Sequence, residues 1–199
     1  MMLALLKFDL YTSALLKILI PHNNFFDLLF SFFSLKGNSI LIWAIIIVVA
    51  IIIEEKKNPG LSKHDKKFIF LFFISFLTTA LLTTYVLKGV FRRPRPAFRT
   101  NYSQFKIKPV ITSACPVDFS FPSGHAATAF AAATVLTAFN KKRKWLFYLT
   151  AVLISYSRIY LGCHYFLDIL AGSILGYLLS KIILQIDLTK WLSFLVRKK

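Results

Sequence analysis

Long apolar runs alternate with short basic segments along this chain. Five runs stand out, at residues 38–53, 68–87, 126–139, 145–161 and 165–186. A helix rises 1.5 Å per residue, so about 20 apolar residues cross the ~30 Å hydrocarbon core of a bilayer. The pattern therefore predicts an all-α protein, a polytopic transmembrane helical bundle with five spans.

The first 36 residues fit this pattern less well. Lys7, Asp9 and Lys17 interrupt the first apolar run. The second run, residues 25–35, is too short to span the bilayer. We expect two amphipathic helices that lie in the membrane interface, with a tilted sixth span over residues 1–20 as the alternative. The chain is then a single domain in three parts: interfacial N-terminal helices (1–36), the helical bundle (38–186) and a basic tail (187–199).

Two of the runs contain small residues that suit close packing. Residues 126–139 are rich in alanine, and Gly172 and Gly176 form a small-xxx-small pattern in the last run. Small residues let the backbones of neighbouring helices approach each other. We expect the alanine-rich helix to pack between its neighbours, and the two glycines to form a helix-packing face.

Composition and charge support the membrane assignment. Hydrophobic residues make up 57% of the chain and charged residues 17%, and the formal net charge is +17. A charge of this size is also found in nucleic-acid-binding proteins. Here, however, the basic residues cluster between long apolar runs, which is typical of polytopic membrane proteins. We therefore expect membrane lipids as partners and exclude nucleic acid.

The connections between the runs predict an orientation. Lysine-rich segments at 54–67, 140–144 and 187–199 fall on one side of the membrane, and 88–121 and 162–164 fall on the other. Short basic loops mark the cytoplasmic face. We therefore place the first set inside, in a bacterial inner (plasma) membrane. The loop at 88–121 is also basic, and we interpret its arginines as part of an extracytoplasmic anion site.

Cys115 and Cys163 are the only cysteines. They form no CxxC motif and have no metal-type spacing with histidine, so we expect no metal site and no metal cofactor. Each lies beside a candidate site segment, and a disulfide would form if both faced an oxidising compartment. Of the two alternatives, the sequence favours two unpaired thiols.

Three segments that are distant in sequence carry the polar groups suited to chemistry. Lys88 and Arg95 follow the second span, Ser123-Gly124-His125 begin the third, and Arg158 to Asp168 connect the fourth and fifth. Alternating topology brings all three to one membrane face. Together they supply cations, a hydroxyl, two imidazoles and a carboxylate. Phosphoryl transfer without a metal requires such a set of groups.

Single residues of this set also have ordinary structural explanations. Ser123 is a suitable helix N-cap, and Lys88 and Arg158 near span ends resemble snorkelling cations. His164 and Asp168 are four residues apart and share a helix face. There the carboxylate can accept the Nδ1 proton and leave Nε2 as a nucleophile. The coincidence of all these groups on one face favours a functional site.

The three segments resemble the tripartite signature KX6RP, PSGH and SRX5HX3D of the type 2 phosphatidic acid phosphatase superfamily. This superfamily also contains the vanadium haloperoxidases and the bacterial acid phosphatases. Every signature position between Lys88 and Asp168 is present at the family spacing. The apolar spans favour the membrane lipid phosphatase branch, similar to bacterial undecaprenyl-diphosphatases and phosphatidylglycerophosphatases. Members often have six spans, so the resemblance leaves residues 1–36 open.

The resemblance implies a role for each signature residue. His164 would attack phosphorus and form a phosphohistidine, Asp168 would orient His164, and His125 would protonate the leaving group. The phosphate oxygens would be bound by Lys88, Arg95, Ser123, Gly124 and Arg158.

Three arginines of the same loop lie outside the signature, namely Arg92, Arg93 and Arg99. They either recruit anionic headgroups or are solvated charges, and the sequence leaves both alternatives open.

The expected activity is a metal-independent lipid phosphatase without a cofactor. Its substrate would be a phosphomonoester or pyrophosphate such as undecaprenyl pyrophosphate, phosphatidic acid or phosphatidylglycerol phosphate. One alternative is a lipid phosphotransferase that uses the same phosphohistidine. Another is a catalytically silent lipid-binding or transport module. The sequence does not specify an oligomeric state.

Overall fold

The computed structural model describes residues 2–34, 38–55, 63–96 and 115–185, and contains no strand within these ranges. All five expected runs are helical, which confirms the all-α fold class. They correspond to α3 (Asn38–Glu55), α4 (Lys63–Leu81) with the π-helix η1 (Leu82–Leu87) and α5 (Lys88–Phe91), α6 (Gly124–Phe139), α7 (Lys144–Tyr160) and α8 (Phe166–Gln185). The basic tail at 187–199 lies outside the described residues.

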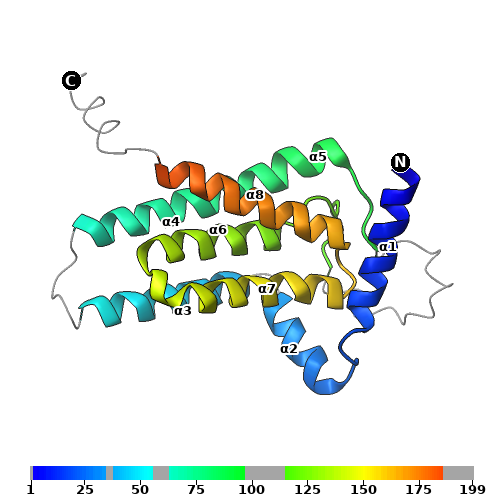
Figure 1. Cartoon of the computed structure of the whole chain (residues 1–199), viewed down its shortest axis with the longest axis horizontal. Helices are drawn as coiled ribbons and strands as arrows, with labels where there is room; N and C mark the ends of the chain where they lie inside the picture. Colours follow the sequence, from blue (N-terminus) through cyan, green and yellow to red (C-terminus); the bar gives the residue numbers. More distant parts are fainter. Residues whose placement is uncertain (1, 35–37, 56–62, 97–114, 186–199) are drawn as a thin grey trace.

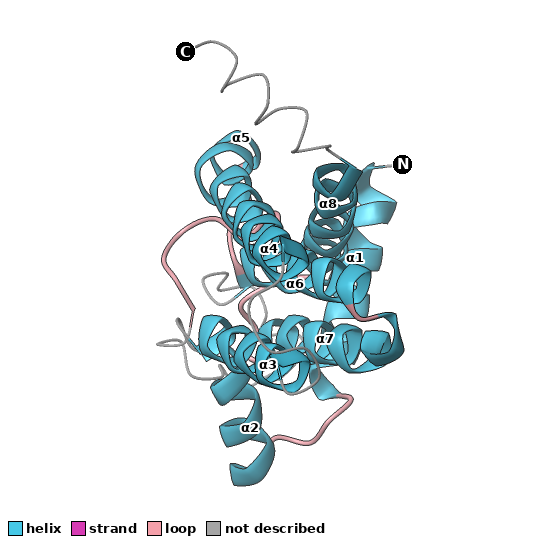
Figure 2. Ribbon diagram, turned by 90° about the vertical axis from the view of Figure 1, so that its left-hand side faces the viewer, coloured by secondary structure: helices cyan, strands magenta, loops and turns pink. Residues whose placement is uncertain are grey.

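Helix α6 lies at the centre of the bundle, between α4 and α8 on one side and α7 on the other (Figures 1 and 2). Its buried side chains are mostly alanines, including Ala126, Ala129 and Ala133. Because alanine is short, three neighbouring helices can approach α6 closely. The expectation that this helix packs between its neighbours is confirmed.

The two glycines of α8 lie in close contact with the backbone of α6. A Cβ atom on Gly172 would lie 2.4 Å from the Ser123 carbonyl oxygen, and one on Gly176 would lie 2.0 Å from the Ala127 carbonyl oxygen. Neither position has room for a side chain. The small-xxx-small pattern is therefore a packing face, and it fixes the start of α6 against α8.

Two N-terminal helices lie outside the bundle: α1 (Met2–Ile18) runs crosswise over one end, and α2 (Asn24–Ser34) lies below α7 (Figure 1). Helix α1 packs on α7 and α8, and α2 packs on α7. In α1 the polar residues Asp9 and Ser13 are buried, whereas Leu5 and Phe8 are exposed. An interfacial helix is expected to turn its polar side to water. Helix α1 instead directs these two polar residues at α8, and its interfacial position stays a prediction.

The outer surface of the bundle is apolar. Large exposed side chains include Ile45 and Val48 of α3, Phe73 and Leu77 of α4, and Leu178 of α8. Among the described residues, helices at Lys67–Phe91 and Phe166–Gln185 are long and apolar enough to cross a membrane, and Ile40–Val49 and Gly124–Phe139 are shorter apolar helices. The count of five spans stays a prediction.

Cys115 and Cys163 form a disulfide. The expectation of two unpaired thiols is wrong. The segment before α6 folds back onto the α7–α8 turn and brings the two Cα atoms to 5.3 Å, within the usual range for a disulfide. The two residues are 48 positions apart in sequence, so only the tertiary fold brings them together.

Candidate active site

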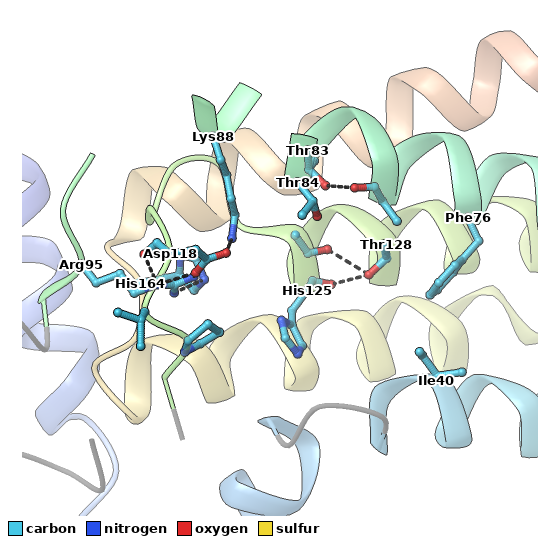
Figure 3. A pocket seen from close by; sticks show the side chains of 14 residues that line it. Ile40, Phe76, Thr83, Thr84, Lys88, Arg95, Asp118, His125, Thr128 and His164 are labelled. Carbon is cyan, nitrogen blue, oxygen red and sulfur yellow. Dashed lines mark hydrogen bonds and ion pairs between the residues drawn. The ribbon is translucent and has the colours of Figure 1, made fainter. Parts of the chain in front are cut away.

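A cavity of about 570 Å³ lies where α4–α5, the start of α6 and the α7–α8 turn meet (Figure 3). Five of the eight residues predicted from the sequence line it: Lys88, Arg95, Gly124, His125 and His164. They belong to all three signature segments, so the predicted convergence of these segments is confirmed. The chemical roles of the residues stay predictions.

Arg95 lies at the centre of the cluster of polar side chains in this cavity. Its side chain is fully buried, and its Nη1 donates to the Cys163 carbonyl oxygen and lies 2.9 Å from Nε2 of His164. Its Nε donates to the carbonyl oxygen of Asp118 at 2.9 Å. Lys88 is also nearly buried and directs its ammonium group into the same cluster (Figure 3). Two predicted phosphate-binding cations thus lie beside the predicted nucleophile.

Asp118 is a cavity residue that the sequence reasoning missed. Its carboxylate forms ion pairs with both Lys88 and Arg95. Burial alone would raise the pKa of Asp118, but hydrogen bonds from Lys88 and Arg95 outweigh burial and hold the pKa below its ordinary value. The sequence did contain a signal, since Asp118 is the only acidic residue between Lys88 and His125. A carboxylate among so many cations is expected to pair with some of them.

His164 lies in the turn between α7 and α8. Its Nδ1 is 3.4 Å from Oδ2 of Asp168, and both side chains are buried. The backbone N–H groups of Cys163 and His164 donate to the Arg158 carbonyl oxygen at 2.9 and 3.2 Å and fix the turn. Gly162 adopts a φ of 70° there, which a glycine tolerates without strain. The imidazole therefore has Asp168 on one side and the cavity on the other.

The environment of His164 favours the neutral imidazole. Burial, and then the positive charges of Arg95 and Arg158, lower its pKa well below the ordinary 6.5. At neutral pH a ring nitrogen then carries a free electron pair, as a nucleophile requires. In this structure Nε2 faces the Arg95 guanidinium at 2.9 Å, so Arg95 has to shift before Nε2 can attack a phosphorus atom.

Ser123 and Gly124 have different roles at the start of α6. Ser123 is buried outside the cavity lining, its Oγ accepts from the Ala126 N–H at 3.4 Å, and its own N–H donates to the Asp168 carbonyl oxygen at 3.0 Å. It is therefore the N-cap of α6. Gly124 faces the cavity, and so does His125, which stands apart from the charged cluster (Figure 3).

Arg158 is fully buried near the end of α7 and does not line the cavity. Its Nη1 donates to the carbonyl oxygen of Ser34 at 2.8 Å and also to the Ser34 hydroxyl, which ties α2 to the site. Its Nε and Nη2 have no hydrogen-bond partner among the described residues. A buried guanidinium with unused donors is suited to binding an anion.

Arg93 is not a plain solvated charge, so that alternative is wrong for this residue, and recruitment of headgroups by Arg93 stays untested. Its guanidinium pairs with Asp168 and Asp9, and its side chain is 20% exposed. Arg92 differs, because it is exposed and its Nε donates to the carbonyl oxygen of Gly89 in its own helical turn. Arg99 lies outside the described residues.

Comparisons with known proteins agree with this arrangement. The sequence model of the PAP2 superfamily matches residues 68–192. An undecaprenyl-diphosphatase of Sulfolobus acidocaldarius is 43% identical over 75 residues, which are 37% of this chain and 36% of that relative. This chain thus covers little more than a third of that relative's length.

Two solved structures share the fold. Aquifex aeolicus LpxE has a TM-score of 0.66 and 25% identity, over 90% of this chain and 96% of that chain. A transmembrane PAP2-type phosphatidylglycerolphosphate phosphatase of Bacillus subtilis has a TM-score of 0.56 and 25% identity, over 90% of this chain and 84% of that chain. The similarity to both structures extends over nearly the whole chain.

Proposed function

Because this chain belongs to the PAP2 superfamily, we propose that it is an integral membrane phosphatase that hydrolyses a phosphomonoester or pyrophosphate headgroup of a lipid. The observation that carries the proposal is the buried His164 imidazole beside Arg95 and Lys88 in one cavity. Cations that neutralise phosphate oxygens next to a neutral nucleophile are the main requirement of metal-free phosphoryl transfer.

In this mechanism Lys88 and Arg95 bind the oxygens of the phosphoryl group. Arg158 lies behind the cavity lining, and its Nε and Nη2, which have no hydrogen-bond partner among the described residues, would turn toward a bound phosphate. The backbone N–H of Gly124 adds the positive end of the α6 dipole. Ser123 contributes as the cap that holds the first turn of α6 in place. Charge that develops on the phosphoryl oxygens is thereby stabilised by groups that are already positioned.

The chemical step exchanges one bond at phosphorus for another. Nε2 of His164 attacks phosphorus, the bond to the leaving oxygen breaks, and His125 gives that oxygen a proton. The imidazole becomes positively charged, and Asp168 beside Nδ1 stabilises that charge. Water then attacks the phosphohistidine, with His125 accepting a proton, and releases phosphate.

A second, apolar cavity supports a lipid as substrate. It has a volume of about 260 Å³ between α3 and α4, with a lining that includes Trp43, Phe68 and Phe72. It shares Ile40 and Phe76 with the polar cavity, so the two spaces adjoin. A headgroup in the polar cavity would leave its hydrocarbon chain beside this apolar space. Undecaprenyl pyrophosphate, phosphatidic acid and phosphatidylglycerol phosphate all combine a phosphate or pyrophosphate headgroup with hydrocarbon chains.

The proposed location is the plasma membrane, with the site on the extracytoplasmic face. The Cys115–Cys163 disulfide lies at the end of the bundle that holds the active site. It supports this orientation, because disulfides persist in oxidising compartments. The lysines of residues 140–144, which connect α6 to α7 at the other end, support a cytoplasmic position for that end.

The test is release of inorganic phosphate from a panel of lipid phosphates and pyrophosphates by the purified protein in detergent. We expect turnover by the wild type and a loss of at least about 10³-fold in His164→Ala, because the nucleophile is removed. EDTA is expected to leave the rate unchanged. Transfer of phosphate to an added acceptor would indicate a phosphotransferase. Binding without turnover of any substrate would indicate a silent lipid-binding module and contradict the proposal.

A further inference from the structure

A chain of buried ion pairs lies behind His164, outside the cavity. Oδ1 of Asp168 accepts from Nη1 of Arg93 at 2.6 Å, and Nη2 of Arg93 pairs with Oδ2 of Asp9 on α1. Both carboxylates have fully buried side chains. These contacts join residues that are 75 and 84 positions apart in sequence.

The N-terminal helix also holds the first turn of α8, which carries Asp168. Oδ1 of Asp9 accepts from the Leu167 N–H at 2.8 Å, and the Ser13 hydroxyl oxygen accepts from the Phe166 N–H at 2.8 Å. The first N–H groups of a helix have no partner within the helix, so α1 supplies the acceptors for α8. Helix α1 thus contacts Asp168 through its backbone neighbours and through Arg93.

Arg93 is fixed on more than one side. Besides its two carboxylate partners, its guanidinium carbon lies 4.0 Å from the centroid of the Tyr165 ring. Oδ2 of Asp168 accepts from the Tyr165 N–H at 2.9 Å, so each oxygen of this carboxylate has a defined donor. The plane of the carboxylate is therefore set, with Oδ2 close to Nδ1 of His164.

We propose that Arg93 and Asp9 are positioning residues for the His164–Asp168 pair, which makes the N-terminal helix part of the active site. A buried carboxylate without a cation tends to take up a proton or to rotate toward water. Arg93 favours the ionised form of Asp168 and directs it at Nδ1, and the Asp9 carboxylate pairs with the other side of Arg93. The three groups together carry one net negative charge, which matches the positive charge that develops on His164. This inference rests on the proposed phosphohistidine chemistry.

A positioning role for Arg93 predicts other kinetics than recruitment of substrate by Arg93 would. In Arg93→Gln, kcat is expected to fall about 100-fold, while KM and the inhibition constant for orthovanadate change less than twofold. Arg93→Lys keeps the charge and is expected to lose no more than about 10-fold in kcat. The matched control is the neighbouring Arg92→Gln, which is expected to keep wild-type kcat because Arg92 is exposed.

Asp9 provides a second, independent test. Asp9→Asn is expected to lower kcat about 10-fold with KM unchanged. The double variant Asp9→Asn/Arg93→Gln is expected to be no slower than Arg93→Gln, since both substitutions break one network. Thermal unfolding in detergent and orthovanadate binding by calorimetry verify folding and site integrity without requiring turnover.

Three outcomes would overturn the inference. The first is a rise in KM at unchanged kcat in Arg93→Gln, which is expected of headgroup recruitment. The second is wild-type kcat in both Arg93→Lys and Asp9→Asn, which decides the matter even if Arg93→Gln does not fold. The third is additive losses in the double variant. A wild type that releases no phosphate from any lipid would instead overturn the proposed function.

Discussion

Asp118 binds the same two cations that a phosphate in the cavity requires. Its carboxylate pairs with Lys88 and Arg95, and its pKa is held low enough for it to stay ionised at neutral pH. All three side-chain nitrogen atoms of Arg95 already have partners: Nε and Nη2 contact Asp118, and Nη1 contacts Cys163 and His164. A bound phosphate therefore has to compete with Asp118 for these donors.

Removal of this competing charge is expected to strengthen anion binding. In Asp118→Asn, KM for the lipid phosphate and the inhibition constant for orthovanadate should each fall about 3- to 10-fold. This corresponds to about 1 kcal/mol, the upper range for a partly exposed ion pair. Asp118 has a side chain that is 42% exposed, so solvent screening limits the effect. Steady-state kinetics measure both constants.

The control for this substitution is Asp27→Asn on α2. Asp27 pairs with His22 and is similarly exposed, at 35%, but it does not line the cavity. Both constants are expected to stay at wild-type values in this variant. Weaker orthovanadate inhibition in Asp118→Asn than in the wild type would contradict the prediction and would indicate that Asp118 organises the cations for the substrate.

The acidic side of the pH–rate profile is expected to report on His164, and the alkaline side on His125, which must be protonated to give a proton to the leaving group. The neutral imidazole is the reactive form, and its pKa lies well below 6.5 because of burial and the nearby charges of Arg95, Arg158 and Lys88. Activity should therefore persist as pH falls through 6.5 and decline only in more acidic solution. A profile of kcat/KM between about pH 4 and pH 8 measures this decline, because the range extends well below the ordinary pKa of histidine. A half-maximal kcat/KM at or above pH 6.5 on the acidic side of the profile would refute a nucleophile with a lowered pKa.

At the level of secondary-structure elements, the contact between α6 and α8 holds the active site together. Gly172 packs on the Ser123 carbonyl group, which accepts the first hydrogen bond of α6 from Ala127 at 3.0 Å. The Ser123 N–H donates to the Asp168 carbonyl group. The start of α6 and the first turn of α8 thus form one unit, and a change in their separation would move Gly124 relative to His164.

A methyl group at this contact is expected to lower both the stability and the activity of the protein. Gly176→Ala would place a Cβ 2.0 Å from a backbone oxygen, so the helices must shift. We expect a loss of about 1–3 kcal/mol in unfolding free energy, typical of overpacking, together with lower kcat. Thermal unfolding in detergent and phosphate release measure the two effects.

Gly89→Ala is the matched control for this helix contact. A Cβ at Gly89 would meet nothing within 4 Å. Alanine favours a helix by about 1 kcal/mol over glycine, so this variant should unfold at the same or a higher temperature than the wild type. Equal stability of the two alanine variants would show that the α6–α8 separation is not critical.

For the whole molecule, the disulfide and the polar cavity share the end of the bundle at the α7–α8 turn. Figure 1 shows the loop between α6 and α7 at the opposite end. This arrangement predicts which end faces the oxidising side of the membrane. Among the described residues no cysteine is free. A single introduced cysteine can therefore report which end is accessible.

Labelling with a membrane-impermeant maleimide in intact cells is expected to modify Val117→Cys, because Val117 is 91% exposed beside the cavity. The control is Lys142→Cys, an exposed position in the loop between α6 and α7. It should react only after the membrane is permeabilised. The reverse pattern would place the site on the cytoplasmic face.

The amino-acid sequence by itself determined the helices and predicted that the signature segments meet at one end of the bundle. Both are consequences of local patterns: apolar runs form helices in a membrane, and alternating crossings bring every second connection to the same side. The spacing of Lys88 and Arg95, and that of His164 and Asp168, is likewise a local property. These features could be predicted without knowledge of any distant contact.

Only the tertiary structure decided which distant residues are partners. The Cys115–Cys163 bond, the bridge of Asp118 to Arg95, and the contact of Asp9 with Arg93 all join separate segments. Their pairing depends on how the helices pack, and packing is a collective property of many side chains. A buried charge must find an opposite charge when the chain folds, but the sequence does not specify which one.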